Sequence, residues 1–375
     1  MKRMKSKILK ISIALIIILA FTNCKIYRFV VYNFSDITDY KIFPSNKIEN
    51  SNNHFIYPNS KKPFPIDSVT FTTKKSTTKK SFENLLSENE TVAFLVIQND
   101  SILYENYFSK YEEESVVASF SMAKSVLSLL IGCAIDDGKI KSINEPITNY
   151  IPELKNNGFD NVKISDLLNM TSGIEFNESY YNPFGNAASV YYGTDLRKEI
   201  SKLKITREPS TKFKYSSGDS QILGLVLHAS LKGQTISNYL QEKIWIPLGM
   251  EYDATWSLDK KNGVEKTFCC LNARARDFAK IGRLYLNEGN WNGKQIVSKE
   301  WIQNSLTPNT TSGDYANYKN QWWLNPDSGS YMAQGINGQY IYVNPSKKLI
   351  IVKLGRRYGK ANWSKLFELI ANKVK

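Results

Sequence analysis

The stretch "FSMAKSV" at Phe120–Val126 decides how the rest of the chain is interpreted. It places a serine, Ser121, three residues before a lysine, Lys124, at the start of an apolar segment that continues to Ile135. A spacing of three makes the two side chains neighbours on one face of a helix. Because the apolar residues wrap widely around that helix, we expect it to be largely buried, with Ser119 as its N-cap and Gly138 closing its end.

These two residues have a chemical rationale as a catalytic pair. A serine hydroxyl is a poor nucleophile until a base removes its proton. The amine of Lys124 can be that base only if its pKa is lowered, and burial does so because a low dielectric disfavours the ammonium. Ser121 would lie in the first helical turn, where the positive end of the helix dipole favours a developing alkoxide. The segment therefore predicts Ser121 as nucleophile and Lys124 as its base.

The Ser-x-x-Lys spacing is weak evidence when taken alone. It occurs four times, at Ser76–Lys79, Ser121–Lys124, Ser201–Lys204 and Ser257–Lys260. Only the second copy follows a predicted hairpin and begins a buried helix, so its context favours Ser121 and Lys124 as the catalytic pair. The alternative is the start of an ordinary amphipathic helix.

Other kinds of active site lack the residues that they need. A Ser-His-Asp triad requires a histidine, and the chain has only His54, in a polar segment, and His228, in the apolar "LGLVLHASL". A histidine in such a segment is more often part of the core or the helix surface than a base. No G-x-S-x-G elbow, HExxH motif or phosphate-binding loop is present. We therefore expect neither a metal nor a cofactor.

A second polar element, "YSS" at Tyr215–Ser217, stands just before another apolar segment. Tyr215 can relay a proton between Ser121, Lys124 and a leaving group where a neighbouring cation lowers its pKa. The alternative is simple packing, since the chain contains 22 tyrosines. Four further aromatic residues are candidates either for a pocket or for the core: Tyr180, Tyr181, Trp322 and Trp323.

The order of the predicted elements indicates an α/β fold. Val92–Phe108 and Gly338–Gly355 each contain two β-prone runs around a turn, so each predicts a hairpin. The residues between them are mostly helical in pattern, and Ala361–Val374 predicts a final amphipathic helix. This order implies a central antiparallel sheet built from both chain ends, with flanking helices and an inserted, mostly helical subdomain.

The N-terminus has the features of an export signal. Basic residues precede a short apolar run, Ile11–Phe21, and Cys24 follows, as in the lipidation site of bacterial lipoproteins, although Asn23 is larger than is usual before that cysteine. We expect residues 1–24 to be a signal peptide with Cys24 as the lipid attachment site. Plain secretion and an uncleaved anchor helix are the alternatives. The folded part would then be anchored to a membrane of the cell envelope and face the periplasm or the exterior.

Charge and cysteines limit the remaining possibilities. The net charge of +14 is spread along the chain without any nucleic-acid-binding motif, so we expect no nucleic-acid partner. Cys133 lies in the apolar segment, so we expect it to be a small residue of the core. Cys269 and Cys270 are adjacent and are not expected to pair with each other, whereas a disulfide from Cys133 to either of them stays open.

Five motifs in a fixed order resemble a known superfamily. "SMAK", "LLNMTSGI", "YSS", "PLGME" and "GINGQYIYVNP" are similar to the motifs of serine hydrolases of the β-lactamase and penicillin-binding-protein superfamily. The class C-like branch, with 6-aminohexanoate-dimer hydrolases and related esterases, is the most similar. The resemblance implies a β-lactamase-like domain over residues 89–375. It would be preceded by an extension over 25–88, in which "TTKKSTTKKS" (Thr72–Ser81) predicts an exposed linker.

The resemblance also implies roles for particular residues. Ser121 matches the acylated nucleophile, Lys124 its base, and Tyr215 the tyrosine of the second motif. The backbone N–H groups of Ser121 and Gln339 would form the oxyanion hole. The expected substrate-binding positions are Ser217, where the family has asparagine, and Ile336, Asn337 and Gly338.

Two departures from the family pattern bear on the substrate. The third motif of β-lactamases and peptidases begins with lysine or histidine, where this chain has Ile336, and the asparagine of the second motif is Ser217. Both changes disfavour a β-lactam or peptide, and they make a neutral ester or amide the expected substrate. A β-lactamase or D-alanyl-D-alanine peptidase is the first alternative, and a catalytically silent envelope-binding protein is the second.

Overall fold

A computed structural model of the chain describes residues 7, 10–12, 24–32, 34–72, 77–309 and 317–374. Most of the predicted export signal therefore lies outside the described residues, whereas Cys24 begins helix α2 (Cys24–Tyr32). Within those ranges, no helix combines the length and the apolar character that a membrane crossing requires.

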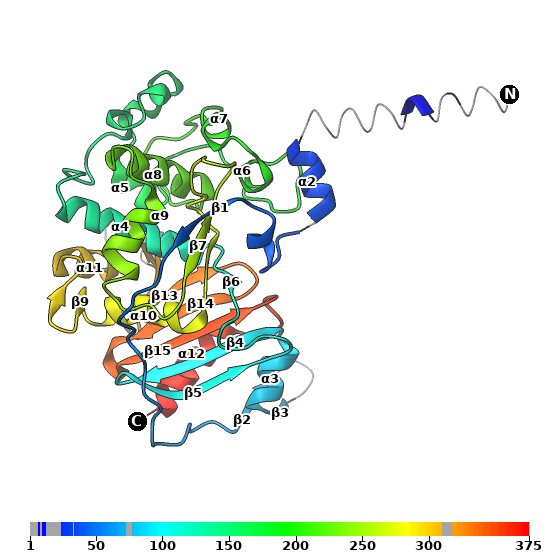
Figure 1. Cartoon of the computed structure of the whole chain (residues 1–375), viewed down its shortest axis with the longest axis vertical. Helices are drawn as coiled ribbons and strands as arrows, with labels where there is room; N and C mark the ends of the chain where they lie inside the picture. The colour runs from blue at the N-terminus through cyan, green and yellow to red at the C-terminus, as the bar shows by residue number, and fades with distance from the viewer. Residues whose placement is uncertain are drawn as a thin grey trace.

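The centre of the molecule is a seven-stranded antiparallel sheet in the order β11-β12-β13-β14-β15-β4-β5 (Figure 1). Its strands are β4 (Thr91–Gln98), β5 (Ser101–Tyr107), β11 (Tyr318–Lys319), β12 (Trp322–Asn325), β13 (Ser330–Gly335), β14 (Gln339–Asn344) and β15 (Leu349–Gly355). Strand β15 pairs with β4, with Leu349 opposite Gln98. Both predicted hairpins and the sheet built from the two chain ends are thus confirmed.

Helices cover both faces of this sheet because side chains alternate along each strand. Ile341 and Ile350 belong to the main core, which also contains residues of α4 (Met122–Asp136) and α10 (Ala275–Leu286). Tyr340 and Ile351 point to the other face, where they share a second core with α12 (Trp363–Lys373) and α3 (Phe82–Glu88).

A mostly helical subdomain is inserted between β5 and the C-terminal strands (Figure 1). Its helices besides α4 are α5 (Ile164–Leu168), α6 (Asn186–Tyr192), α7 (Leu196–Ile200), α8 (Ser217–Ser230) and α9 (Ile236–Leu240), and α11 (Lys299–Leu306) follows α10. A second sheet, in the order β1-β7-β8-β6, consists of β1 (Ser45–Ile48), β6 (Val117–Ala118), β7 (Ala254–Ser257) and β8 (Leu271–Ala273). Two further antiparallel pairs are β2 (Ser68–Thr72) with β3 (Thr77–Ser81), and β9 (Asn290–Trp291) with β10 (Lys294–Gln295).

The N-terminal extension packs against the domain. Strand β1 pairs with β7, and Ser68 lies opposite Ser81 where β2 pairs with β3. The last part of the predicted linker, Thr77–Ser81, is therefore a strand and not a loop, although Lys79 and Ser81 are exposed as expected, and residues 73–76 lie outside the described residues. Pairing with β2, whose Val69 is buried opposite Lys80, stabilises as a strand a segment whose composition favours a loop.

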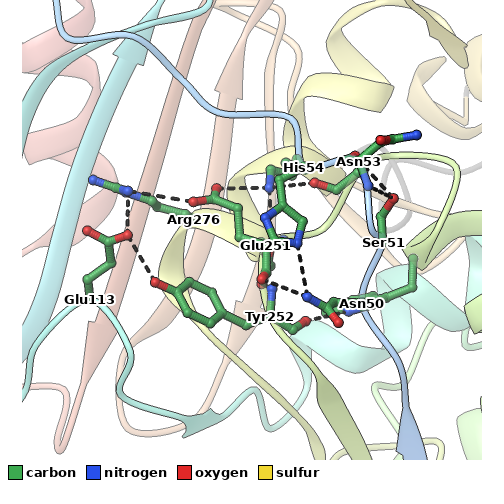
Figure 2. A network of polar contacts seen from close by, with 12 residues as sticks. Asn50, Ser51, Asn53, His54, Glu113, Glu251, Tyr252 and Arg276 are labelled. Atoms are coloured by element: carbon green, nitrogen blue, oxygen red, sulfur yellow. Dashed lines mark hydrogen bonds and ion pairs between the residues drawn. The ribbon is translucent and has the colours of Figure 1, made fainter.

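A polar network fixes the next part of the extension (Figure 2). Asn50 donates from Nδ2 to the carbonyl oxygen of Glu251 over 3.0 Å and lies 3.1 Å from Nε2 of His54. The Glu251 carboxylate accepts from buried Lys280 over 2.9 Å and lies 3.6 Å from Arg276, which also pairs with Glu113. His54 is therefore part of this network, and the contacts described for Ser121 do not include it.

Candidate active site

Helix α4 carries the predicted catalytic pair at its beginning. Its N-cap is Ser121, so the expectation that Ser119 caps the helix is wrong. Ser119 instead donates its N–H to Leu271 of β8 over 2.9 Å, which draws it into the second sheet. Between them, Phe120 is buried at a φ of 45°, a conformation that is strained for a bulky residue. Strained backbone of this kind is concentrated at functional sites, and here it immediately precedes the serine.

Lys124 is held by three oxygen atoms. Its Nζ lies 2.9 Å from Ser121 Oγ, 2.7 Å from the carbonyl oxygen of Phe268 and 3.2 Å from Ser217 Oγ. The side chain is only 1% exposed. Burial lowers the pKa of Lys124 to about 8, and the charge of Glu178 acts in the opposite direction. A lysine with such a pKa is a neutral amine in a substantial fraction of molecules near neutral pH, as a general base requires.

Tyr215 adjoins Lys124 and Ser121. Lys124 Nζ lies 5.1 Å from its ring centroid, and the Ser121 side chain acts on its hydroxyl in the direction that lowers the pKa. The ring is stacked on Trp323, with centroids 5.9 Å apart and an interplanar angle of 21°. Burial raises the pKa of Tyr215, and the Glu178 charge raises it further, so the expected lowering by a cation does not occur. The phenol keeps its proton at neutral pH and can donate it.

Glu178 is a member of this group that the sequence did not indicate. Its carboxylate accepts from Ser217 Oγ over 2.5 Å and from the Ser217 N–H over 2.8 Å. Tyr180 also donates to it, over 2.7 Å. Glu178 lies in the loop before α6, and no motif surrounds it. Only the fold brings this loop to the start of α8, so no sequence signal would have found it.

The turn between β13 and β14 lies against the start of α4. A Cβ atom on Gly335 would stand 2.5 Å from the carbonyl oxygen of Ser119 and 3.1 Å from the Ser121 nitrogen, so glycine is required there. Gly335 is paired with Gln339, the first residue of β14. The backbone of Ser121 and that of Gln339 therefore both adjoin Gly335. The Gln339 side chain is turned away from the site, with Oε1 accepting from the Gly355 N–H over 3.2 Å.

The other predicted binding positions have different surroundings. Asn337 donates from Nδ2 to the carbonyl oxygen of Ser35 over 2.9 Å, and partly buried Ile336 packs against the main core. Gly338, at a φ of 79°, leaves room for Lys353, whose Nζ lies 2.5 Å from the place that a Cβ would take. Of the four predicted substrate-binding residues, Ser217 is the one whose side chain contacts Lys124.

The four aromatic candidates lie in different surroundings. Trp322 is fully buried and packs on Tyr285, so it belongs to the core. Trp323 stacks on Tyr215, and Tyr180 binds Glu178, so both adjoin the site. Tyr181 is 76% exposed.

A disulfide between two consecutive cysteines comes directly after Phe268 in the chain, the residue whose carbonyl oxygen contacts Lys124. Cys269 and Cys270 are bonded to each other, contrary to our expectation, and Cys133 is a buried free thiol. Cys270 has a φ of 71°, so the backbone at the second cysteine of the bonded pair is left-handed. Cys133 lies near the far end of α4, where its Sγ contacts the carbonyl oxygen of Ile296.

The described part of the chain contains no group of His, Cys, Asp and Glu side chains arranged to hold a metal ion. The arrangement around Ser121 contains the kinds of group that acyl transfer uses. They are a buried serine hydroxyl, a lysine of lowered pKa, a phenol that keeps its proton, and backbone N–H groups beside the same glycine.

Comparisons with known proteins agree with this arrangement. A family model described as Beta-lactamase matches residues 81–374. The chain is 27% identical over 301 residues to the 6-aminohexanoate-dimer hydrolase of Paenarthrobacter ureafaciens, covering 72% of this chain and 74% of that protein.

Two solved structures share the fold. A Bacillus anthracis protein, provisionally described as a 6-aminohexanoate-dimer hydrolase, has a TM-score of 0.81 at 24% identity over 90% of this chain and 93% of its own. A family VIII carboxylesterase has a TM-score of 0.64 at 15% identity over 78% of this chain and 95% of its own.

Proposed function

Because the chain belongs to the β-lactamase family, whose members are hydrolases, we propose that it is a serine hydrolase that cleaves an ester or amide through an acyl-enzyme on Ser121. The observation that carries this proposal is the 2.9 Å contact between Ser121 Oγ and Lys124 Nζ, made by a lysine that is buried and of lowered pKa.

The proposed reaction has two balanced halves. Ser121 Oγ bonds to the carbonyl carbon of the substrate while its proton passes to neutral Lys124 Nζ. The bond to the leaving group then breaks, and Tyr215 gives the leaving group its proton while recovering one from Lys124. Water repeats the sequence on the acyl-enzyme and releases the acid. The backbone N–H groups of Ser121 and Gln339 would stabilise the oxyanion in both halves, where one such donor contributes about 3 kcal/mol.

Two features support a neutral ester or amide as the substrate. The position where β-lactamases and peptidases carry a cation is Ile336, which packs against the core and offers no charge to a substrate carboxylate. The relatives include proteins described as a 6-aminohexanoate-dimer hydrolase and a carboxylesterase. A β-lactamase or D-alanyl-D-alanine peptidase is the alternative substrate class.

We also propose that the protein is a lipoprotein of the cell envelope, attached to the membrane through Cys24. The apolar run before that cysteine supports this. Cys24→Ala should move the protein from the membrane fraction to the soluble fraction. Retention in the membrane would instead favour an uncleaved anchor.

The test of the activity is covalent labelling by a fluorophosphonate, read as intact mass, beside turnover of a p-nitrophenyl ester. Wild type and Ser128→Ala, another buried serine of α4, should each gain one adduct and hydrolyse the ester. Ser121→Ala should do neither. A fluorescent penicillin that labels Ser121 would favour the β-lactamase or peptidase alternative. No adduct on wild type would leave the silent binding protein.

A further inference from the structure

Helix α2 presents an unpartnered apolar face. Tyr27, Val30 and Val31 are 51%, 66% and 51% exposed, and their spacing places them on one side of the helix. The opposite side is fixed to the domain, because Phe29 packs edge-on against Tyr192 of α6 and Lys25 donates to Ser189 over 3.0 Å. Figure 1 shows α2 beside α6, on the side of the helical subdomain. The orientation of the exposed face is therefore set by the body of the protein.

The same apolar surface continues onto the loop that carries Glu178. Phe34, just after α2, is 50% exposed and packs against Tyr181 with ring centroids 5.4 Å apart. Tyr181 and Phe184 are each 76% exposed. We call the apolar patch the six residues Tyr27, Val30, Val31, Phe34, Tyr181 and Phe184. Two segments that are about 150 residues apart in sequence build it, and both are attached to α6.

Large apolar side chains are concentrated here. The described residues include eleven that are exposed, and seven of these are the patch and the adjoining Tyr32. An apolar concentration of this kind on a soluble domain marks an interaction surface. Aromatic side chains with a polar tip, such as Tyr27 and Tyr181, are typical of the interfacial layer of a membrane.

The sequence before α2 identifies the partner. The apolar run Ile11–Phe21 ends three residues before α2, and Cys24 is the first residue of that helix. Whether the chain is held by a lipid on Cys24 or by the uncleaved run, it enters α2 from the membrane. A helix of nine residues is about 13 Å long, so its exposed face stays within reach of the lipid surface. The excess of basic over acidic residues, which persists when residues 1–24 are left out, adds attraction to anionic headgroups.

We propose that the apolar patch lies in the interfacial layer of the membrane to which the N-terminus is attached. The domain then has one fixed orientation instead of moving freely on a tether. The loop that positions Glu178 and Tyr180 is held at the lipid surface. This proposal rests on the proposed membrane attachment of the N-terminus and does not depend on the catalytic role of Ser121.

The experiment uses the full, membrane-attached chain in vesicles of phosphatidylethanolamine and phosphatidylglycerol. In a Cys133→Ser background, Tyr181→Cys and Phe184→Cys are labelled with an environment-sensitive fluorophore, and peptide mass mapping confirms the labelled position. Ile246→Cys, at an apolar residue that is 43% exposed outside the patch, is the matched control. The quenchers are lipids with brominated acyl chains.

The expected result is quenching of about twofold or more at positions 181 and 184, with no change at 246, because interfacial residues reach the acyl boundary. Equal quenching at all three positions, or none at any, would overturn the proposal. A second copy is the competing occupant. Efficient disulfide cross-linking of Phe184→Cys between chains in detergent would assign the patch to a dimer instead. Neither readout involves turnover. A protein that docks but has no activity would therefore contradict the proposed hydrolase function and still support this inference.

Discussion

The carbonyl oxygen of Phe268 accepts a hydrogen bond from Lys124 Nζ over 2.7 Å. A neutral amine has two hydrogens and one lone pair. Phe268 O can only accept, and Ser217 Oγ, which donates its own proton to Glu178, must also accept from Lys124. Both hydrogens of the neutral amine are thereby assigned. Its lone pair is left facing the Ser121 hydroxyl, which is the orientation that proton abstraction requires.

The rate of acylation should follow the deprotonation of Lys124. We expect kcat/KM for a p-nitrophenyl ester to be low at pH 6, to rise through the lysine pKa of about 8 and to level off above it. The profile is measured on the free enzyme at low substrate concentration. A flat profile between pH 6 and 9 would contradict Lys124 as the base.

Replacing Lys124 should also change stability with a definite sign. Its pKa in the folded chain, about 8, is below the ordinary 10.5, so the unfolded chain binds more protons between these values and stability rises with pH there. Below pH 8 the folded protein carries the full cost of the buried charge. Lys124→Met should therefore abolish activity yet raise the unfolding free energy at pH 6 by on the order of 1–3 kcal/mol, with a smaller gain above pH 10. Urea unfolding at both pH values measures this, and destabilisation at pH 6 would refute it.

Glu178 should act as a positioning residue, through its charge and through Ser217. Because the carboxylate raises the pKa of Lys124, Glu178→Gln should move the rise of the pH profile to lower pH. The matched control is Glu175→Gln, an exposed carboxylate of the same loop, which should leave the profile in place. A loss of activity with no movement along the pH axis would mean that Glu178 is merely structural.

Removing the Tyr215 hydroxyl should separate catalysis from packing. Tyr215→Phe keeps the stack on Trp323 but deletes the proton donor, so kcat should fall by about 10²–10⁴ while the melting temperature changes little. Tyr318→Phe, in the same aromatic cluster, is the control and should retain activity. Wild-type turnover by Tyr215→Phe would exclude a relay through this phenol.

The disulfide between Cys269 and Cys270 should support Lys124 through Phe268. Alkylation of the denatured chain should modify two more thiols after reduction than before it. Cys269→Ser with Cys270→Ser should lower kcat/KM and displace its pH dependence, because the carbonyl oxygen of Phe268 loses its fixed place. Cys133→Ser should do neither. If the thiol count is the same with and without reductant, the bond does not form.

The network around Glu251 should contribute to stability alone. Lys280 is fully buried and pairs with Glu251 and Asp277, so Glu251→Gln leaves it with half of its compensating charge. We expect a loss of about 2–4 kcal/mol in the unfolding free energy with unchanged kcat/KM. Glu288→Gln, which removes an exposed pair with Lys299, should cost at most about 0.5 kcal/mol. Similar effects of the two changes would show that the buried network adds nothing.

Periodicity explains what could be predicted from the sequence. The hairpins were recognisable because β-branched and aromatic residues flank short turns, and α4 because its apolar residues surround a helix. Local pattern also placed Gly138 at the end of α4, where it has a φ of 68°. These features depend on residues close together in the chain.

The unforeseen features depend on tertiary structure. The Phe268 carbonyl belongs to the backbone, and any residue type would supply it. Its contact with Lys124 therefore cannot be recognised from the residue type at position 268. Glu178 meets Ser217 only because a loop 39 residues away folds back onto α8. The pairing of Cys269 with Cys270 occurs where Cys270 has a left-handed backbone, and nothing in the neighbouring sequence indicates that conformation.

The adjacency of β15 and β4 has a consequence for how the protein comes to be made. Leu349 pairs with Gln98, so the middle of the main sheet joins residues about 250 positions apart. Contacts between residues so far apart in sequence form slowly, because closing the intervening chain costs conformational entropy before the contacts are made. The edge of β4 that pairs with β15 therefore stays unpaired until the last strands have been synthesised. With the export proposed above, the chain can complete its sheet only after nearly all of it has been translocated, and until then it depends on protection from aggregation.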